Sequence, residues 1–556
     1  MVKVKGALQR AATSFPTKFT THIINSSSMH HAGALDQFGL LIVNNDLSIK
    51  GVDSVLRYAS FLVSDKLYVL LRSPSCQKRC EHTWKKYISL YYSSASCVCP
   101  GLDICILLPR TPQTVVNKSR IFGVVITDDM TSDENEIIEL ASAFGTGSDG
   151  CNVFRYKVAL ADEPSSEESQ ITTYPSVCVG GTFDMFHHGH RVLLSIAALL
   201  TSCRLLVGIT DICLLHEKFL APLIQVYEVR EAVLTKFLTD IDFPEKQLEI
   251  CRLTDPYGPP SHQPDFQCIV ASLETVRGCE KINEMRRSLN FDPLHIEEVE
   301  YVDRKGTDGL CRPRDYVDFK FSSSTFRLNL LGRPLLCLPS ARVKPKHASW
   351  VIGLTGPIAS GKSTISRYLE DCAGDRVCLL NADPICRTVY ESSPQSCMNL
   401  GIYFNLEPIK RLDAPLHFNV FEQSKIVSFV KLEVNRLQAG DYLDPPIVVL
   451  ESTLLFEVGL DAICDEIWTV FIPHSEAMSR IGARYCITDE KMLSSARNQM
   501  SESKDDWWTP CQRDLGVGPI GRANIVFCTS WDAEFTRVQV KRAWEYFSQS
   551  ISMLVP

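Results

Sequence analysis

The 556-residue sequence has no apolar run of about 18 or more residues, the length that a membrane-spanning helix needs. It also lacks a basic excess, because 57 Lys and Arg face 65 Asp and Glu, for a net charge of −8. Proteins that coat nucleic acid or anionic membranes need a basic surface. Gly and Pro, 29 residues each, are too few for a collagen or a low-complexity polymer. We therefore expect a globular protein with no integral membrane segment and no nucleic-acid partner.

A secretory signal is also missing, since the first 30 residues lack an apolar core segment. The 22 cysteines are too few for a disulfide scaffold of this length, which favours reduced thiols inside a cell. Lys3, Lys5, Arg10 and Lys18 precede the first acid, Asp36. This composition fits a mitochondrial presequence or a frayed polar terminus. We expect an intracellular protein, either cytoplasmic or mitochondrial.

Two stretches divide the chain into blocks. Residues 161–173 are acidic and rich in Ser, and residues 332–349 combine three prolines with several basic residues. Both are typical of linkers, so we predict domains at 1–160, 174–335 and 349–556. The second and third blocks each open with an apolar run, a glycine-rich turn and a helical pattern. This order predicts two doubly wound parallel α/β sheets, with ligands bound at the carboxyl ends of the strands.

The first block gives less evidence of its fold and function than the other two blocks. Apolar runs at 38–43, 67–71, 104–108 and 121–126 indicate strands, so its fold is of the α/β kind without further definition. Its function and its protein partners stay open. One cluster permits a zinc site, but its spacing is not that of a familiar zinc ribbon or finger, so free or buried thiols are the favoured interpretation. The cluster consists of Cys76, Cys80, His82, Cys97 and Cys99.

The third block contains the pattern G-x-x-x-x-G-K-S at residues 356–363, between a strand and a helix. Glycines allow backbone N–H groups to turn inward around a phosphate, and the helix N-terminus adds positive charge. We expect Lys362 to bridge the β- and γ-phosphates of ATP and Ser363 to ligate Mg²⁺. A structural glycine turn is the alternative. The remaining residues of the expected cradle are Gly356, Pro357, Ile358, Ala359, Ser360, Gly361 and Thr364.

Charged residues farther along indicate the acceptor side of this site. Asp383 ends an apolar run, where a carboxylate could take a proton from an attacking hydroxyl, although it could simply cap a helix. Arg480, Arg484 and Arg497 lie around a helix–turn–helix pattern. Such a hairpin suits a lid that closes on transferring phosphoryl oxygens, and a solvated helix face is the alternative.

From residue 350 to about 547, this block resembles dephospho-coenzyme A kinase. The resemblance rests on the glycine loop, NADPICR at 381–387, LLFE at 454–457, the spacing of Arg480 and Arg484, and RNQ at 497–499. It implies that Asp383 is the base for the ribose 3′-hydroxyl and that the arginines contact the transferred phosphate. The family usually has Asp where this chain has Asn381, and a shorter acid where it has Glu451.

The most specific run of the second block is GGTFDMFHHGH at 180–190. Two histidines that flank a glycine at the start of a helix can face an anion there. A weak metal site or a plain helix start are the alternatives. The run resembles the H-x-G-H nucleotidyltransferases, and more narrowly phosphopantetheine adenylyltransferase. The resemblance implies a contact from His190 to the reacting phosphate and an ATP site. That site would include Gly181, Thr182, Phe183 and His187.

Further residues follow in that family's order. Lys218 matches the lysine that touches the acceptor phosphate and the α-phosphate, and Arg230 follows in the next helix. Runs at 255–258 and 272–278 are similar to the eukaryotic form of the enzyme. The run SSSTFR at 322–327 is similar to a Ser/Thr-rich segment that holds the triphosphate. In this chain those hydroxyls belong to Ser323, Ser324 and Thr325.

Together, the second and third blocks resemble the bifunctional coenzyme A synthase family. The resemblance implies ATP, 4′-phosphopantetheine and dephospho-coenzyme A as substrates and Mg²⁺ as cofactor. It also implies two steps, adenylyl transfer and then 3′-phosphorylation. Two alternatives stay open. One is a cytidylyl- or FMN-type nucleotidyltransferase fused to an unrelated P-loop kinase. The other is a partly decayed scaffold that binds nucleotide or coenzyme A, which Asn381 permits.

Overall fold

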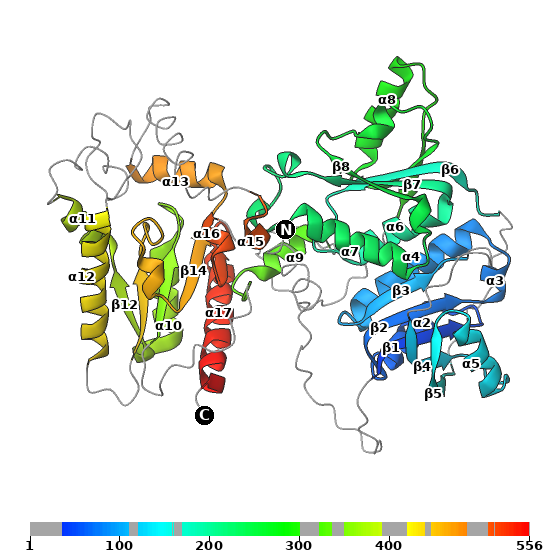
Figure 1. Ribbon diagram of the computed structural model, residues 1–556, viewed down its shortest axis with the longest axis horizontal. Helices are drawn as coiled ribbons and strands as arrows, with labels where there is room; N and C mark the ends of the chain where they lie inside the picture. Colours follow the sequence, from blue (N-terminus) through cyan, green and yellow to red (C-terminus); the bar gives the residue numbers. More distant parts are fainter. Residues whose placement is uncertain are drawn as a thin grey trace. The chain divides into compact units, whose positions relative to one another are not determined.

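The computed structural model describes residues 36–109, 120–157, 160, 170–300, 322–335, 350–391, 420–439, 446–485, 510–515 and 518–554. These residues form three five-stranded sheets with helices between the strands (Figure 1). Each predicted block contains one sheet, and all the strand pairings are parallel. The predicted α/β fold is therefore confirmed. The predicted presequence lies outside the described residues. No helix in the described part of the chain combines the length and the apolar character that a bilayer crossing requires.

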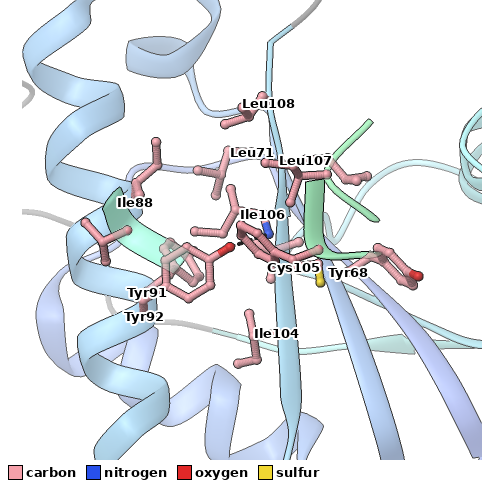
Figure 2. Packing of buried hydrophobic residues seen from close by; sticks show 14 of the residues in the cluster. Tyr68, Leu71, Ile88, Tyr91, Tyr92, Ile104, Cys105, Ile106, Leu107 and Leu108 are labelled. Atoms are coloured by element: carbon pink, nitrogen blue, oxygen red, sulfur yellow. Dashed lines mark hydrogen bonds between the residues drawn. The ribbon is translucent and has the colours of Figure 1, made fainter. Parts of the chain in front are cut away.

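The first sheet has the strand order β3-β2-β1-β4-β5. Its strands are β1 (Asp36–Val43), β2 (Val63–Leu71), β3 (Asp103–Leu107), β4 (Ile121–Thr127) and β5 (Thr146–Arg155). Its helices are α2 (Ile49–Ala59), α3 (Pro74–Gln77), α4 (Glu81–Val98) and α5 (Glu134–Ser142). The four strands predicted in this block are confirmed. Figure 2 shows Ile88, Tyr91 and Tyr92 of α4 packed against β3, beside Ile104 and Ile106.

The second sheet has the order β10-β9-β6-β7-β8, which is the first sheet's order taken from the opposite edge. Its strands are β6 (Tyr174–Gly181), β7 (Thr201–Thr210), β8 (Leu248–Leu253), β9 (Cys268–Ser272) and β10 (His295–Val299). Its helices are α6 (His188–Leu200), α7 (Tyr227–Asp240) and α8 (Val276–Ser288). The first and second sheets share one apolar core and belong to one compact unit.

The third sheet has the order β12-β13-β11-β14-β15. Its strands are β11 (Val351–Thr355), β12 (Val377–Asn381), β13 (Ile447–Glu451), β14 (Glu466–Phe471) and β15 (Ile525–Cys528). Its helices are α10 (Lys362–Ala373), α11 (Asp383–Glu391), α12 (Val420–Gln438), α13 (His474–Tyr485), α15 (Gln512–Leu515), α16 (Gly518–Gly521) and α17 (Ala533–Leu554). Helices α11 and α12 cover one face, and α10 and α17 cover the other (Figure 1). Both faces are buried, which explains the continuous apolar runs of these strands.

Two segments from the second sequence block belong to the compact unit of the third sheet. They are Leu215–Val226 and the helix α9 (Ser323–Leu330) from Ser324 onward. Leu220 and Leu223 share an apolar cluster with Leu328 of α9 and with Phe471 and Phe535 of the kinase-like block. The sequence composition predicted that the second domain ends at residue 335. The packing instead assigns Leu215–Val226 and the chain from Ser324 onward to the unit of the third sheet.

Candidate active sites

The loop between β6 and α6 carries the H-x-G-H run. Phe183 and Met185 have left-handed backbone φ angles of 49° and 47°, which turn the chain sharply after the strand. Asp184 between them is fully buried. A side chain at Gly181 would begin 3.3 Å from the Phe183 ring, so this turn leaves little room there. The loop ends with His187 as the N-cap residue of α6.

The two motif histidines hold each other at the start of α6. His187 Nδ1 accepts the N–H of Gly189 at 3.1 Å, and His190 Nδ1 accepts the N–H of His187 at 3.4 Å. A ring nitrogen that accepts a hydrogen bond carries no proton, so each neutral ring carries its proton on Nε2. Burial lowers the pKa of His190 well below its usual value, and the positive charge of Arg191 acts in the same direction. His190 is therefore a neutral N–H donor at a helix N-terminus.

The first residue of α9 meets this loop. Ser323 Oγ donates to the carbonyl of Asp184 at 2.7 Å and lies 3.5 Å from His187 Nε2. Because His187 carries its proton on Nε2, that proton points to the serine oxygen. The structure thus brings together three predicted residues, Ser323, His187 and His190.

Other predicted residues of this site lie in the second compact unit. Lys218 is exposed in the Leu215–Val226 segment. Thr325 is buried, and Ser324 Oγ accepts a 3.2 Å hydrogen bond from Arg327. Arg327 also donates to the carbonyl of Phe219 at 2.8 Å, which ties α9 to the lysine segment. This link was not expected from the sequence, where the two segments are about a hundred residues apart.

Arg230 of α7 connects two loops, which its place in the sequence did not reveal. Its guanidinium donates to the carbonyl of Thr182 at 2.7 Å and to the carbonyl of Thr210 at 2.9 Å. These carbonyls follow the adjacent strands β6 and β7. Arg230 is buried and therefore holds the two loops at the carboxyl ends of these strands.

The second site is the glycine loop between β11 and α10. Gly361 has a φ of 92°, and a side chain there would begin 2.9 Å from Thr529 Oγ1. Lys362 opens α10, and its Nζ donates to the carbonyls of Gly356 and Pro357 at 2.9 and 3.4 Å. The ammonium group therefore lies within the loop that would surround a phosphate. The loop also includes Ile358, Ala359, Ser360 and Thr364.

A carboxylate lies against the loop serine. Ser363 Oγ donates to Glu451 Oε1 at 2.8 Å, and Ser366 Oγ donates to Glu451 Oε2 at 2.7 Å. Glu451 ends β13, the strand beside β11. A hydroxyl and a carboxylate are hard oxygen donors of the kind that Mg²⁺ prefers, with substrate phosphates as its other ligands. The residues present therefore fit a magnesium ion, and Glu451 joins the predicted ligand Ser363.

Asp383 begins α11 and is held at both carboxylate oxygens. Oδ1 accepts the N–H of Thr453 at 2.9 Å and the hydroxyl of Ser452 at 3.3 Å, while Oδ2 accepts the hydroxyl of Thr453 at 2.9 Å. Asn381 Oδ1 accepts the N–H of Asp383 at 2.9 Å. Asn381, where the family usually has Asp, thus accepts the N–H of the first residue of α11, and an amide oxygen suffices for this contact.

Arg480 of α13 lies over the glycine loop. It donates to the carbonyl of Ala359 at 3.3 Å and to the carbonyl and hydroxyl of Thr529 at 2.7 and 3.0 Å. Thr529 Oγ1 in turn donates to the carbonyl of Ser360 at 2.7 Å. Thr529 is a loop contact that the sequence did not single out. Arg484 lies one turn farther along α13, and Arg497 lies outside the described residues.

Three thiols of the cysteine cluster in the first block, those of Cys76, Cys80 and Cys99, are buried, whereas Cys97 is exposed. Burial raises the pKa of both Cys76 and Cys99 to about 12. Neither thiol readily gives the thiolate that a zinc site needs. Across the described part of the chain, no three His, Cys, Asp or Glu side chains are grouped to hold a metal ion.

Two family models match the chain. The model described as Cytidylyltransferase-like covers residues 178–329, and the model described as Dephospho-CoA kinase covers residues 350–417. Each match includes the motif that carries its site, the H-x-G-H loop in the first case and the glycine loop with Asp383 in the second.

The relatives of this chain also form two groups, one named phosphopantetheine adenylyltransferase and the other dephospho-CoA kinase. A phosphopantetheine adenylyltransferase of Methanosarcina mazei is 35% identical over 23% of this chain and 81% of its own length. The Saccharomyces cerevisiae protein of that name is 37% identical over 24% of this chain, and the match spans only 43% of the yeast protein. A dephospho-CoA kinase of Moorella thermoacetica is 27% identical over 36% of this chain and 94% of its own length.

Proposed function

Because the chain belongs to the phosphopantetheine adenylyltransferase family and continues into a dephospho-CoA kinase domain, we propose that it makes coenzyme A from 4′-phosphopantetheine in two steps. The H-x-G-H domain transfers the adenylyl group of ATP, and the P-loop domain phosphorylates the product. The chain is a bifunctional enzyme of the transferase class. The observation that carries the proposal is that the H-x-G-H loop and the glycine loop each follow the first strand of their own sheet, at its carboxyl end.

In the first step, the phosphate of 4′-phosphopantetheine attacks the α-phosphorus of ATP, and pyrophosphate leaves as dephospho-CoA forms. The attacking phosphate is already a nucleophile at neutral pH, so positioning and charge neutralisation supply the catalysis. His190 would donate its Nε2 proton as a hydrogen bond to an α-phosphoryl oxygen. Lys218 would neutralise the reacting phosphates. Ser323, Ser324 and Thr325 would hold the triphosphate at the start of α9.

In the second step, the ribose 3′-hydroxyl of dephospho-CoA attacks the γ-phosphorus of a second ATP, and ADP leaves. Asp383 would accept the hydroxyl proton, and the contacts from Ser452 and Thr453 keep its carboxylate directed. Lys362, Arg480 and Arg484 would stabilise the charge on the transferring phosphoryl oxygens.

Ser363 and Glu451 would hold Mg²⁺ in the kinase domain. The ion would neutralise charge on the β- and γ-phosphates when bound. Cytoplasm and mitochondrion both remain proposed locations, and the basic composition of the first 35 residues supports the latter.

Incubation of the purified protein with ATP, Mg²⁺ and 4′-phosphopantetheine tests the proposal by mass spectrometry of the products. We expect dephospho-CoA and then CoA, with pyrophosphate and ADP as co-products. His190→Ala should abolish adenylyl transfer and spare the kinase, and Lys362→Ala should do the reverse. Turnover with CTP or FMN instead would favour another nucleotidyltransferase, and binding of ATP without turnover would favour a decayed scaffold.

A further inference from the structure

Among the residues that the structure describes, the turn after β1 differs from the motif loops after β6 and β11. After β1, the backbone N–H groups of Asn44 and Asn45 donate to the carboxylate of Asp128, at 2.7 and 3.0 Å. Here a carboxylate of the chain already occupies them. The first sheet also shares its apolar core with the second sheet.

The first sheet contacts the catalytic helix α6. Strand β3 lies at the edge of the first sheet, where it packs beside α4 and α7. The carbonyl of Ile104 accepts a 2.9 Å hydrogen bond from Arg191, and the N–H of Ile106 donates to Tyr92 OH at 3.2 Å (Figure 2). An uncovered edge strand invites pairing with other chains, so this coverage also protects the protein. Arg191 is the residue that follows His190.

An ion-pair network crosses the same interface. Arg191 Nη1 lies 2.6 Å from Asp103 Oδ1, and Lys66 Nζ lies 3.2 Å from Asp103 Oδ2. Lys66 also pairs with Asp240, the last residue of α7. Burial alone would raise the pKa of Asp103, but Arg191 and Lys66 together lower it below its usual value. The carboxylate is thus charged and holds α6, while Lys66 holds α7.

Aromatic rings also pack against residues of the first turn of α6. The ring of Tyr92 lies 5.9 Å from the ring of His188, measured between centroids. The guanidinium of Arg191 lies 5.3 Å from the centre of the Phe186 ring and 5.1 Å from that of Phe237. The first turn of a helix has backbone N–H groups without intrahelical partners and frays easily. Here Tyr92 of the N-terminal domain lies beside it, whereas Phe186 and Phe237 come from the same domain as α6.

We propose that the N-terminal domain is a positioning element of the adenylyltransferase site, in which Asp103 and the edge of β3 hold Arg191 and so fix the orientation of His190. The inference rests on the proposed adenylyl transfer. Asp103 and Arg191 are positioning residues, since neither is assigned a contact with substrate. A donor that stabilises a transition state must be placed within a fraction of an ångström, so loss of this anchor should reduce turnover more than substrate binding.

The test compares Arg191→Gln, Asp103→Asn and the double variant in the full-length protein. Each single change should lower kcat for adenylyl transfer by at least about tenfold, with KM for ATP and 4′-phosphopantetheine within about threefold. The double variant should be no worse than the poorer single variant, because both changes remove the same contact. Asp103→Glu, which keeps the charge, should recover part of the loss. Kinase turnover in the same samples should stay within about twofold.

Arg204→Gln is the matched control. Arg204 also pairs with two carboxylates, those of Glu249 and Asp265, and lies against an aromatic ring, that of Phe266. It should leave kcat within about twofold. A lower melting temperature with unchanged kcat in Asp103→Asn and Arg191→Gln would overturn the inference, and so would an equal loss in Arg204→Gln. Wild-type protein without adenylyl transfer would overturn the proposed function and this inference together, whereas active wild type with fully active variants would overturn the inference alone.

Discussion

Ser363 donates its hydroxyl hydrogen to Glu451 across 2.8 Å, which joins the phosphate loop after β11 to the end of the neighbouring strand β13. Glu451 is nearly buried and accepts a second hydroxyl, that of Ser366, on its other oxygen. Both carboxylate oxygens are therefore directed toward the loop. Ser363 and Glu451 are oxygen donors of the kind that Mg²⁺ prefers.

Glu451→Gln should lower kinase kcat by about 100-fold and raise the Mg²⁺ concentration needed for half-maximal rate, because the amide lacks the charge that attracts the ion. Initial rates measured against dephospho-CoA over a range of Mg²⁺ concentrations check this. Glu451→Asp keeps the charge and should retain most of the activity. Adenylyl transfer by the same preparation should not change, and an equal loss in both reactions would show that the substitution merely unfolds the protein.

Asn381→Asp should change kinase turnover by less than about threefold. The side-chain oxygen of residue 381 already accepts the N–H of Asp383, and a carboxylate oxygen does the same. Asp383→Asn should instead cost at least about 100-fold, because an amide cannot accept the proton of the 3′-hydroxyl. Steady-state kinetics of the two variants with dephospho-CoA give the comparison. A gain of tenfold or more in Asn381→Asp would mean that the chain has lost a catalytic carboxylate at this position.

The sequence predicted those parts of the fold and of the sites that are determined by residues close to one another in the chain. The glycine loop of residues 356–363 and the turn after β6 are local patterns, and the strands before them are continuous apolar runs. Glu451 and Thr529 contact the loop although both are far from it in the sequence. No spacing within the sequence connects them with Ser363 or Ser360. Contacts of this kind are decided when sheets and helices pack.

The same reason explains what was missed in the first block. Its four strands were predicted from apolar runs, but the pairing of Asp103 with Arg191 joins two domains and leaves no local signal. The packing of Leu220, Leu223 and Leu328 with Phe471 and Phe535 was likewise missed, because composition placed the three leucines in the second block and the two phenylalanines in the third. Apolar residues at a loop or a helix show that a surface will be covered, and do not show by what.

The proton position on His190 can be tested with two amide substitutions. His190→Asn places an oxygen near Nδ1, so it keeps the acceptor for the N–H of His187 and loses the Nε2 donor. His190→Gln places an amide near Nε2 and loses the capping acceptor. We expect His190→Asn to cost at least about 100-fold in adenylyl-transfer kcat with little change in melting temperature. His190→Gln should retain more activity and lose about 1 kcal/mol of stability.

Kinetics and thermal unfolding of the two His190 variants together make the comparison. The opposite ranking of activities would place the catalytic contact on Nδ1, contrary to the tautomer that the hydrogen bonds specify. The kinase rate of each variant serves as the internal control for protein quality.

The last prediction concerns a buried carboxyl in the kinase sheet. Glu466 begins β14 and is 1% exposed. Its Oε2 accepts the indole N–H of Trp468 at 2.7 Å, and among the described residues its Oε1 has no hydrogen-bond partner. The pKa of Glu466 is raised from 4.5 to about 7, mainly by burial; the hydrogen bond from Trp468 opposes this rise, and the nearby charge of Asp465 adds to it. The folded protein therefore retains a proton here that the unfolded chain releases.

Since the folded state binds this proton more tightly, its contribution to stability is fully present below pH 4.5 and is lost as the pH rises through about 7. At pH 8 the loss should approach about 3 kcal/mol. Glu466→Gln removes the titration, so the variant should match wild type near pH 5 and be more stable at pH 8. Urea unfolding of the full chain, followed by hydrogen exchange of β14 peptides at both pH values, measures this. Glu534→Gln, at an exposed site on α17, should show no such pH-dependent gain. An equal shift in both variants at pH 8 would assign the effect to net charge rather than to the buried carboxyl.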